Sequence, residues 1–299
     1  MTPPEIFAES PGALLGQEPH PNPIEGARSP LWALLRACHP MPTAAVTIGA
    51  SILAATAGAD AGRTLLIGIA VLTGQLSVGW SNDWFDAARD RAVGRADKPI
   101  VARGLTARTV AASALVAAAA TTGFSLLLGW TPGVLHLIAV GSAWLYNWPL
   151  KATPVSVLPY LVSFGLLPAF VTTAAGHSTP PGWLVVAGSL LGGGAHFANV
   201  LPDFAHDDQT GVRGLPHRLG AAGSRAATVF LLLAAGGLIT LGPAGPASWI
   251  GVAVLATSTI ALIGAAFARR RLGEGLLFRV VAAVALADVA LLLTAPTPG

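Results

Sequence analysis

The sequence predicts an all-α, polytopic membrane protein with nine transmembrane helices. Composition is the first reason, because 53% of the residues are hydrophobic and only 10% are charged, whereas soluble domains contain about 25% charged residues. The second is a series of apolar segments, most of which reach the roughly 20 residues that a helix needs to cross about 30 Å of hydrocarbon. The third is the concentration of basic residues in a few loops, as in multi-pass membrane proteins.

The chain begins with a segment that does not resemble a membrane span. Residues 1–28 are rich in proline and glutamate, a composition typical of disordered segments. The segment also lacks the basic start and the apolar run of a signal peptide. We therefore expect a disordered, Pro-rich tail over residues 1–28 and one transmembrane domain over residues 29–299.

Nine apolar segments follow the tail. The expected spans are residues 30–57, 63–82, 106–128, 132–149, 155–175, 182–202, 224–242, 247–268 and 275–294. Pro40, Pro42, Pro159 and Pro168 lie inside these spans and predict kinks, which a bundle tolerates when neighbouring groups satisfy the freed backbone. The 35 glycines favour close packing of the helices in lipid.

The distribution of Lys and Arg sets the expected orientation. With nine spans, all 17 Lys and Arg residues except Arg63 fall on the side that holds the tail and the loops after every second span. The positive-inside rule makes that side cytoplasmic. We therefore expect a multi-pass protein of the plasma membrane.

An acidic motif lies at the cytoplasmic end of the second span. Asn82, Asp86 and Asp90 are each four residues apart, which places them on one face of a helix. Carboxylates at this spacing repel one another, so stability alone would disfavour them. A hard divalent cation such as Mg²⁺ takes oxygen ligands and often binds together with a phosphate. The motif therefore indicates a metal site.

A second copy of the motif follows later in the chain. Asn199, Asp203 and Asp207 have the same spacing, and in each copy a glycine and then a proline follow at matching distances. The shared pattern, N-x3-D-x3-D-x3-G-x4-P, indicates an internal duplication that converges on one site. We expect two four-helix pseudo-repeats and one additional helix.

Basic residues accompany both copies of the motif. Lys98 lies between the Gly and the Pro of the first copy, and Arg213 lies between those of the second. Carboxylates that hold Mg²⁺, with cations that bind the remaining phosphate oxygens, suit a diphosphate. With apolar spans behind them to house a hydrocarbon chain, they indicate a polyprenyl diphosphate. Asp83, Asp97 and Asp208 lie off the repeated face, and a solvated, salt-bridged loop is an equally good interpretation for them.

Further polar residues lie on the same side of the membrane. Tyr146 and Lys151 close the fourth span. They are either an interfacial anchor or, functionally, a wall of the pocket and a diphosphate partner. Arg36 lies inside the first span, where a charge is costly and usually functional, unless its side chain reaches the interface.

Four histidines and one acid have simpler interpretations. His39, His196, His206 and His217 do not form a convincing set of metal ligands, and each is expected to pack or to form hydrogen bonds. A proton role stays open for the last two because they lie close to the second motif. Asp288 is expected to form a hydrogen bond between helices, with a proton pathway as the alternative.

At these residues the chain resembles the UbiA superfamily of intramembrane aromatic prenyltransferases. Residues 82–90 resemble its NDxxDxxxD motif, residues 203–207 its DxxxD motif, and residues 146–151 its Tyr…Lys element. The resemblance covers about residues 30–294. It implies nine helices around a central cavity and Mg²⁺-dependent loss of diphosphate from an allylic prenyl donor. The resulting carbocation then alkylates an aromatic, quinone-precursor-like acceptor.

The resemblance also implies roles by position. The expected ligands of Mg²⁺ are Asn82, Asp86, Asp90, Asp203 and Asp207. The expected catalytic residues are these four aspartates with Lys151 and Tyr146. The expected substrate-binding residues are Asn82, Asn199, Arg36, Lys98 and Arg213. Among them, Lys98, Lys151 and Arg213 would contact the diphosphate, and Arg36 would orient an acidic acceptor.

Two other functions are compatible with the motifs. A UbiA-type terpene cyclase begins with the same ionisation. A transporter would use the acidic faces for cation coupling, but transport sites lie near the midplane of the membrane, whereas both motifs lie on one side. The chain has no nucleic-acid signature, and its single cysteine excludes a cysteine-based zinc site. Its expected partners are a prenyl diphosphate, a small-molecule acceptor and membrane lipid, and no oligomeric state is indicated.

Overall fold

The protein is an all-α bundle in the part of the chain that the structure describes. This computed structural model describes residues 30–92, 94, 98, 100–101, 105–204, 207, 211–272 and 274–294. The tail expected over residues 1–28 lies outside these residues. The described residues form ten α-helices and two short 3₁₀ helices, with no strand among them. The predicted all-α class is therefore confirmed.

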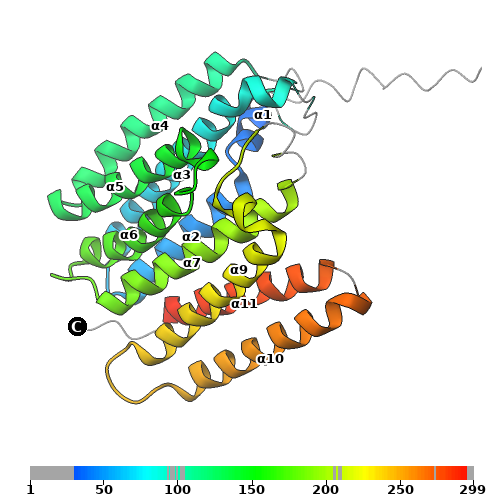
Figure 1. Cartoon of the computed structure of the whole chain (residues 1–299). Helices are drawn as coiled ribbons and strands as arrows, with labels where there is room; N and C mark the ends of the chain where they lie inside the picture. The colour runs from blue at the N-terminus through cyan, green and yellow to red at the C-terminus, as the bar shows by residue number, and fades with distance from the viewer. Residues whose placement is uncertain are drawn as a thin grey trace, which may run out of the picture.

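The helices run side by side along one bundle (Figure 1). In chain order they are α1 (Pro30–Ala37), α2 (Pro40–Thr56), α3 (Ala61–Ala92), α4 (Ala107–Leu127), α5 (Trp130–Asn147), η2 (Leu150–Ala152), α6 (Leu158–Ala175), α7 (Gly182–Val200), η3 (Leu201–Asp203), α9 (Leu215–Leu241), α10 (Trp249–Leu272) and α11 (Glu274–Thr294). The connections α2–α3, α4–α5, α6–α7 and α9–α10 lie at one end of the bundle (Figure 1). The C-terminal ends of α3 and α7, at which the two motifs lie, are at the other end (Figure 1).

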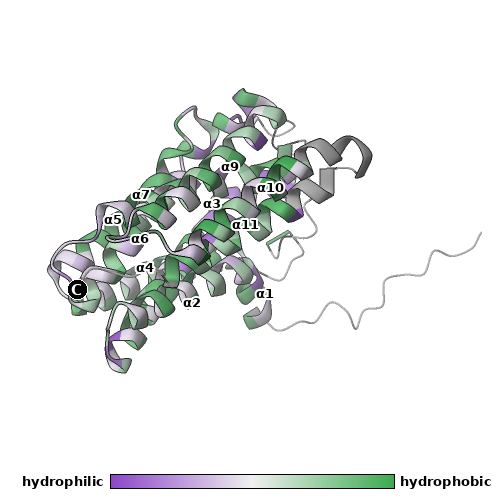
Figure 2. Ribbon diagram, turned by 90° about the horizontal axis from the view of Figure 1, so that it is seen from below, coloured by the Kyte–Doolittle hydropathy of each residue, from purple (hydrophilic) through white to green (hydrophobic). Residues whose placement is uncertain are grey.

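Several helices have the character of membrane spans. In the described part of the chain, α3, α4, α6, α7 and α9 are long and apolar enough to cross a membrane, by length and composition. Apolar residues cover much of the bundle (Figure 2), and large apolar side chains such as Phe230 and Ile260 are about 70% exposed. Such a surface suits a surrounding of lipid rather than water. The count of nine spans stays a prediction.

The first expected span is two helices rather than one. α1 ends at Ala37 and α2 begins at Pro40. A residue before proline is disfavoured in the right-handed α region, and His39 adopts the left-handed conformation instead, with φ 56° and ψ 69°. Pro40 therefore causes a complete break within the span expected over residues 30–57, where only a kink was predicted.

The length of α3 positions the first acidic motif. The helix has 32 residues, which at 1.5 Å per residue make it about 48 Å long, against about 30 Å of hydrocarbon. When its first part crosses the membrane, its last turns therefore extend beyond the apolar layer. Asn82, Asp86 and Asp90 lie in those turns.

Glycines bring α6 and α7 into close contact beside the same end of the bundle. A Cβ atom at Gly188 would lie 2.5 Å from the carbonyl oxygen of Phe164, and one at Gly192 would lie 2.6 Å from that of Tyr160. Small residues allow such close approach of helix backbones in membranes. The packing fixes the end of α7, which carries His196 and Asn199.

The two copies of the motif differ in backbone but share a glycine conformation. The first copy lies on one continuous helix, whereas in the second copy α7 gives way to the 3₁₀ helix η3, which contains Pro202. Proline lacks the N–H that a regular helix would use. Gly94 and Gly211 occupy the same position in the two copies and have positive φ angles of 68° and 74°. Glycine adopts positive φ without a steric penalty from a Cβ atom. The glycine therefore recurs because both copies require positive φ at this position.

Candidate active site

A cavity of about 390 Å³ lies where the segments that carry the two motifs meet. Its polar lining comes from the end of α1, the α1–α2 break, the end of α3, the α3–α4 connection, the ends of α5 and α7, η2, and the start of α9 with the segment before it. The polar and charged residues that line it are Arg36, His39, Asn82, Asp83, Asp86, Arg89, Asp90, Lys98, Tyr146, Lys151, His196, Asn199, Asp207 and His217.

All but two of the expected site residues line this cavity. Arg213 is exposed and lies between Val212 and Gly214, which do line it. The side chain of Asp203 lies outside the described residues, as does His206. The structure therefore brings both copies of the motif to one cavity through Asn82, Asp86 and Asp90 from α3 and Asn199 and Asp207 from the second copy.

Asp86 and Asp90 form the acidic wall contributed by α3. Both are buried, with Asp86 6% and Asp90 4% exposed, and a buried charge requires a partner. Arg89 Nη2 lies 2.7 Å from Asp86 Oδ2, and Lys151 Nζ pairs with the other oxygen of Asp86. Arg89 Nε also lies 4.0 Å from Asp90 Oδ1. Asp86 is thus held between two cations, one from its own helix and one from η2.

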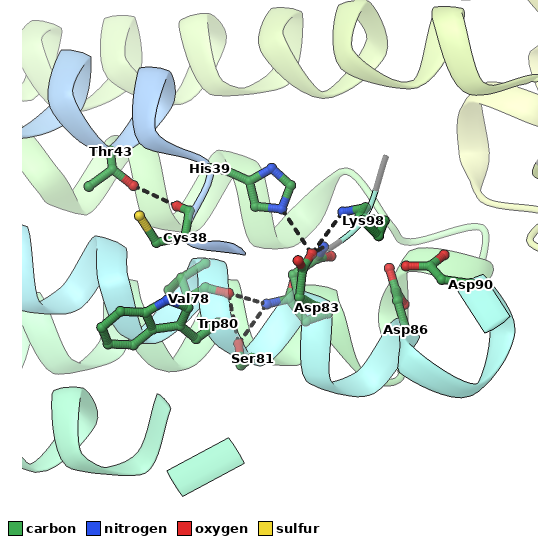
Figure 3. Close-up of polar contacts among 12 residues, drawn as sticks. Cys38, His39, Thr43, Val78, Trp80, Ser81, Asp83, Asp86, Asp90 and Lys98 are labelled. Carbon is green, nitrogen blue, oxygen red and sulfur yellow. Dashed lines mark hydrogen bonds and ion pairs between the residues drawn. The ribbon is translucent and has the colours of Figure 1, made fainter. Parts of the chain in front are cut away.

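Asp83 is a buried member of the site that the sequence reasoning placed off the shared face. Its Oδ1 accepts from Lys98 Nζ at 2.7 Å and lies 3.2 Å from His39 Nε2. The carboxylates of Asp83, Asp86 and Asp90 lie on the same side of α3 (Figure 3). Residues at i, i+3 and i+7 share a helix face just as residues at i, i+4 and i+8 do, so this spacing was the signal that could have identified Asp83.

Lys151 is a largely buried cation, with 15% of its side chain exposed. Burial lowers the pKa of its amine, and the carboxylate of Asp86 opposes that shift. The Lys151 amine therefore needs a nearby anion to remain protonated in this buried position. An anionic ligand in the cavity would meet the same need.

Polar contacts fix the end of α5 against α3. Asn147 Nδ2 donates to Ser81 Oγ at 2.8 Å, and Trp144 Nε1 donates to Ser77 Oγ at 2.9 Å. Asn147 and both serines are buried, so these hydrogen bonds are costly to break. They hold Tyr146 at the cavity.

Aromatic rings form another part of the wall. The ring of Tyr146 is perpendicular to those of Tyr160 and His196, at centroid distances of 4.9 and 5.6 Å. His196 is buried, and its Nε2 lies 3.1 Å from Ser156 Oγ. Faces of aromatic rings stabilise cations, so this wall suits a ligand that develops positive charge.

Asp207 of the second copy lines the cavity, and contacts with the start of α9 hold it there. His217 Nε2 lies 3.4 Å from Asp207 Oδ2, and the rings of His217 and Phe204 stack at 4.6 Å. The backbone N–H of Leu215 donates to Ser156 Oγ at 2.9 Å, which ties the start of α9 to the segment before α6. These contacts place Asp207 in the lining together with the carboxylates of α3.

The oxygen ligands suit a metal that binds together with an anion. In the described part of the chain, no three Asp, Glu, His or Cys side chains lie close enough together to hold a metal ion by themselves. Mg²⁺ usually binds through one or two carboxylates and completes its shell with phosphate oxygens and water. Asp86, Asp90 and Asp207 offer carboxylates of this kind around one cavity, so the residues fit Mg²⁺ bound with a phosphate compound.

Known proteins share both the sequence pattern and the fold. The sequence model of the UbiA prenyltransferase family matches residues 43–275. A digeranylgeranylglyceryl phosphate synthase from Methanopyrus kandleri is 29% identical over 210 residues, which cover 67% of this chain and 74% of that protein.

Two solved structures have the same fold at low sequence identity. One is of a digeranylgeranylglyceryl phosphate synthase, with a TM-score of 0.66 and 18% identity, and the match covers 89% of this chain and 98% of that one. The other is a UbiA homologue from Archaeoglobus fulgidus bound to GPP and Mg²⁺. Its TM-score is 0.66 and its identity 14%, and the match covers 88% of this chain and all of that one.

Proposed function

The chain belongs to the UbiA prenyltransferase family, and on this basis we propose that it transfers a prenyl group from a prenyl diphosphate to a small acceptor. The observation that carries the proposal is the single cavity in which residues of both acidic motifs meet Lys151 and Tyr146. The carboxylates and cations in its lining suit a diphosphate with its metal. The apolar helices of the bundle suit the prenyl chain.

We assign the diphosphate end of the donor to the acidic wall. Asn82, Asp86 and Asp90 would hold Mg²⁺ from the side of α3, and Asp203 and Asp207 would hold it from the second copy. When bound, Mg²⁺ supplies a Lewis acid that neutralises charge on the diphosphate. The Archaeoglobus fulgidus homologue, which binds GPP and Mg²⁺, supports this assignment.

Lys151 and Arg89 act on the leaving group. Both pair with Asp86, and a bound diphosphate brings further anionic oxygens within their reach. As the C–O bond of the donor breaks, its electron pair stays with the diphosphate, so negative charge grows where these cations lie. Groups placed at developing charge lower the barrier.

Tyr146 and its aromatic neighbours act on the other product of ionisation. The allylic carbocation needs a wall that stabilises positive charge without reacting with it. The ring of Tyr146, which lines the cavity and packs against Tyr160, meets this need.

The acceptor that we favour is an alcohol that carries a glyceryl phosphate. We expected an aromatic acceptor, but the Methanopyrus kandleri relative is named digeranylgeranylglyceryl phosphate synthase. Arg36 lines the same cavity and offers a cation for the phosphate of such an alcohol. An aromatic acid would use the same cation, so it is the second candidate.

We further propose that nine segments span the plasma membrane and that the cavity opens toward the cytoplasm. α1 and α2 together occupy the position of the first expected span, and the eight later ones each correspond to a helix. The restriction of all Lys and Arg residues except Arg63 to one side supports this orientation.

Product analysis tests the proposed function. Purified protein in lipid nanodiscs receives geranyl diphosphate and Mg²⁺ with an alkyl glyceryl phosphate, with 4-hydroxybenzoate, or without an acceptor. We expect a prenyl ether of the alkyl glyceryl phosphate by mass spectrometry, and a prenylated phenol would favour the second candidate instead. A cyclic hydrocarbon or alcohol without acceptor would indicate a cyclase. If no product forms and no diphosphate is released, the proposed function is wrong.

A further inference from the structure

We propose that His39 takes the proton of the acceptor hydroxyl as the acceptor oxygen attacks the prenyl cation. This inference rests on the proposed transfer to a hydroxyl group. It assigns a chemical role to a residue that belongs to none of the sequence motifs but that has an unusual backbone, a hydrogen bond to a buried carboxylate and a place in the cavity.

The backbone of His39 is unusual. Among the described residues it is the one non-glycine residue with a positive φ, at 56°. Few non-glycine residues adopt this conformation, and residues held in it cluster at functional sites. It breaks what would otherwise be one helix into α1 and α2.

The break is held against α3 by specific contacts. A Cβ atom at Gly79 would lie 2.5 Å from the carbonyl oxygen of Cys38, so only glycine permits this approach. The same carbonyl accepts from Thr43 Oγ1 at 2.8 Å (Figure 3). Trp80 Nε1 donates to the carbonyl oxygen of Leu34 at 2.9 Å. The break is therefore anchored on α3 through Leu34 and Cys38, just before His39, and Thr43 of α2 fixes it from the other side.

These anchors set His39 beside Asp83. Gly79 and Asp83 are one helical turn apart on α3, so a chain that touches the first lies next to the second. His39 Nε2 is 3.2 Å from Asp83 Oδ1, which also accepts from Lys98 Nζ at 2.7 Å. Both side chains point to the same carboxylate in Figure 3.

This hydrogen bond determines which ring nitrogen of His39 is basic. Asp83, paired with the ammonium group of Lys98, is a carboxylate and can only accept. Nε2 of His39 must therefore carry the hydrogen, and the lone pair of neutral imidazole is on Nδ1. Within the described residues, no hydrogen-bond partner occupies Nδ1.

His39 is also the histidine of the cavity best placed to meet an acceptor. Its side chain is 43% exposed, and it lines the cavity together with Arg36, the cation that we assign to the acceptor. His196 is buried and bonded to Ser156 Oγ. His217 is 5% exposed beside Asp207, on the side of the diphosphate.

In the proposed step, one C–O bond breaks, another forms and one proton moves to His39. The C–O bond of the donor breaks, and its electron pair leaves with the diphosphate. A lone pair of the acceptor oxygen forms the new C–O bond, and the hydroxyl proton passes to Nδ1 of His39. Asp83 then faces an imidazolium, whose charge it stabilises, while Lys98 and Arg36 are the other charged groups nearby. The proton returns to water when the product leaves.

Chemical rescue tests this role. His39→Gly keeps the backbone conformation, because glycine adopts positive φ freely, and removes the base together with the hydrogen bond to Asp83. We expect transfer to the alkyl glyceryl phosphate to fall about 100-fold or more, as for loss of a general base. Diphosphate release from geranyl diphosphate without acceptor should stay within about threefold of wild type, since donor ionisation needs no base. Added imidazole should restore transfer at least about tenfold, by the same reasoning.

Two variants complete the test. His39→Gln keeps a donor for Asp83 but offers no basic nitrogen, so it should lose transfer like His39→Gly and gain nothing from imidazole. His177→Gly is the matched control, because His177 bonds to the carbonyl oxygen of Ala57 away from the cavity, and it should keep wild-type transfer. If His39→Gly does not fold, His39→Asn replaces it, since Asn also tolerates this conformation.

The possible outcomes separate this inference from the proposed function. If wild type prenylates no hydroxyl acceptor, the proposed function is wrong. If wild type does so and His39→Gly transfers equally well, the proton goes elsewhere and the role of His39 is wrong. Equal losses of transfer and diphosphate release, or no effect of imidazole, would also refute it by showing a structural role.

Discussion

Asp86 shows why buried carboxylates at a membrane surface need cations. It is 6% exposed and contacts both Arg89 and Lys151. Removing one partner of such a group leaves an uncompensated charge, which commonly costs about 3–5 kcal/mol. These ion pairs therefore stabilise the folded structure around Asp86. They also place the cations of Arg89 and Lys151 where a diphosphate can bind them.

Lys151 should affect the donor more than the acceptor. Lys151→Ala removes a cation from the diphosphate end of the cavity, and a charge-assisted hydrogen bond contributes about 1.5–3 kcal/mol, so we expect the KM for the donor to rise by at least tenfold. The KM for the acceptor should change less than threefold. Arg108→Ala is the control, because Arg108 is exposed on α4 and is not among the residues that line the cavity. Equal increases in both KM values would exclude this role of Lys151.

At the residue scale, the sequence predicted the groups that repeat and missed those that depend on tertiary contact. Asp86 and Asp90 were predicted because their spacing recurs, whereas the role of Lys151 was implied only by the family resemblance. His39 acquires its place only when the α1–α2 break rests on Gly79, and no local pattern encodes that contact. Asp83 was left open between a site role and a solvated loop, because it lies off the face of the i, i+4, i+8 spacing although it shares a face with Asp86 and Asp90 at i, i+3 and i+7.

Among the elements, the α1–α2 break depends on a glycine in α3. In Gly79→Ala the new methyl group would meet the backbone carbonyl of Cys38, which cannot move aside without shifting the break. We expect a loss of about 1–3 kcal/mol in unfolding free energy and a large loss of prenyl transfer. Gly141→Ala is the control, since a Cβ atom there meets nothing within 4 Å. Thermal unfolding in detergent and transfer rates measure both effects, and unchanged values for Gly79→Ala would contradict the close contact.

Arg63 forms hydrogen bonds with two helix C-termini at the end of the bundle away from the cavity. Its Nε donates to the carbonyl oxygen of Ala174 at the end of α6, and its Nη2 donates to that of Leu128 after α4, at 3.3 Å. Cations at helix C-termini satisfy free carbonyls and interact favourably with the helix dipole. Arg63→Ala should therefore cost about 1–2 kcal/mol of stability while leaving the KM values unchanged. Arg63→Lys, which lacks the fork of donors, should recover only part of the loss. A change in KM without a change in stability would argue against a capping role.

At the element scale, apolar length predicted where the helices lie but not where they end. The apolar part of the expected second span stopped at residue 82, and only the spacing of the motif predicted that the helix continues to Asp90. α3 continues to Ala92, because a helix outside the membrane no longer needs apolar residues. The expected first span ran through Pro40, which a kink would have allowed, yet the chain breaks completely there. At the break, the proline and the close contact between Cys38 and Gly79, rather than hydropathy, determine the backbone.

The whole molecule is arranged so that two distant segments of the chain share one end of the bundle. The duplication predicted this arrangement, and Asn82, Asp86, Asn199 and Asp207 line one cavity. The sequence could not give the depth of that cavity or the pairing of its charges, because both follow from how α3, α5 and α7 pack together.

Orientation in the membrane can be tested on the whole protein. In a Cys38→Ser background, Ala92→Cys places a thiol at the exposed end of α3 and Ser178→Cys places one in the exposed α6–α7 connection. A membrane-impermeant maleimide added to intact spheroplasts should label Ser178→Cys, and labelling of Ala92→Cys should require inside-out vesicles. Labelling of both positions from one side would show that the bundle does not span the membrane as proposed.

The most direct measurement is the affinity for one ligand that both motifs must hold. Binding of a non-reactive thiolo analogue of geranyl diphosphate is titrated with and without Mg²⁺ in wild type, Asp86→Asn, Asp207→Asn and the double variant. We expect binding to require Mg²⁺, each single variant to weaken it about 10-fold to 100-fold, and the double variant to lose less than the sum because the two groups share a ligand. Binding that is independent of Mg²⁺, or that only one of the two motifs affects, would contradict a site shared by the ends of α3 and α7.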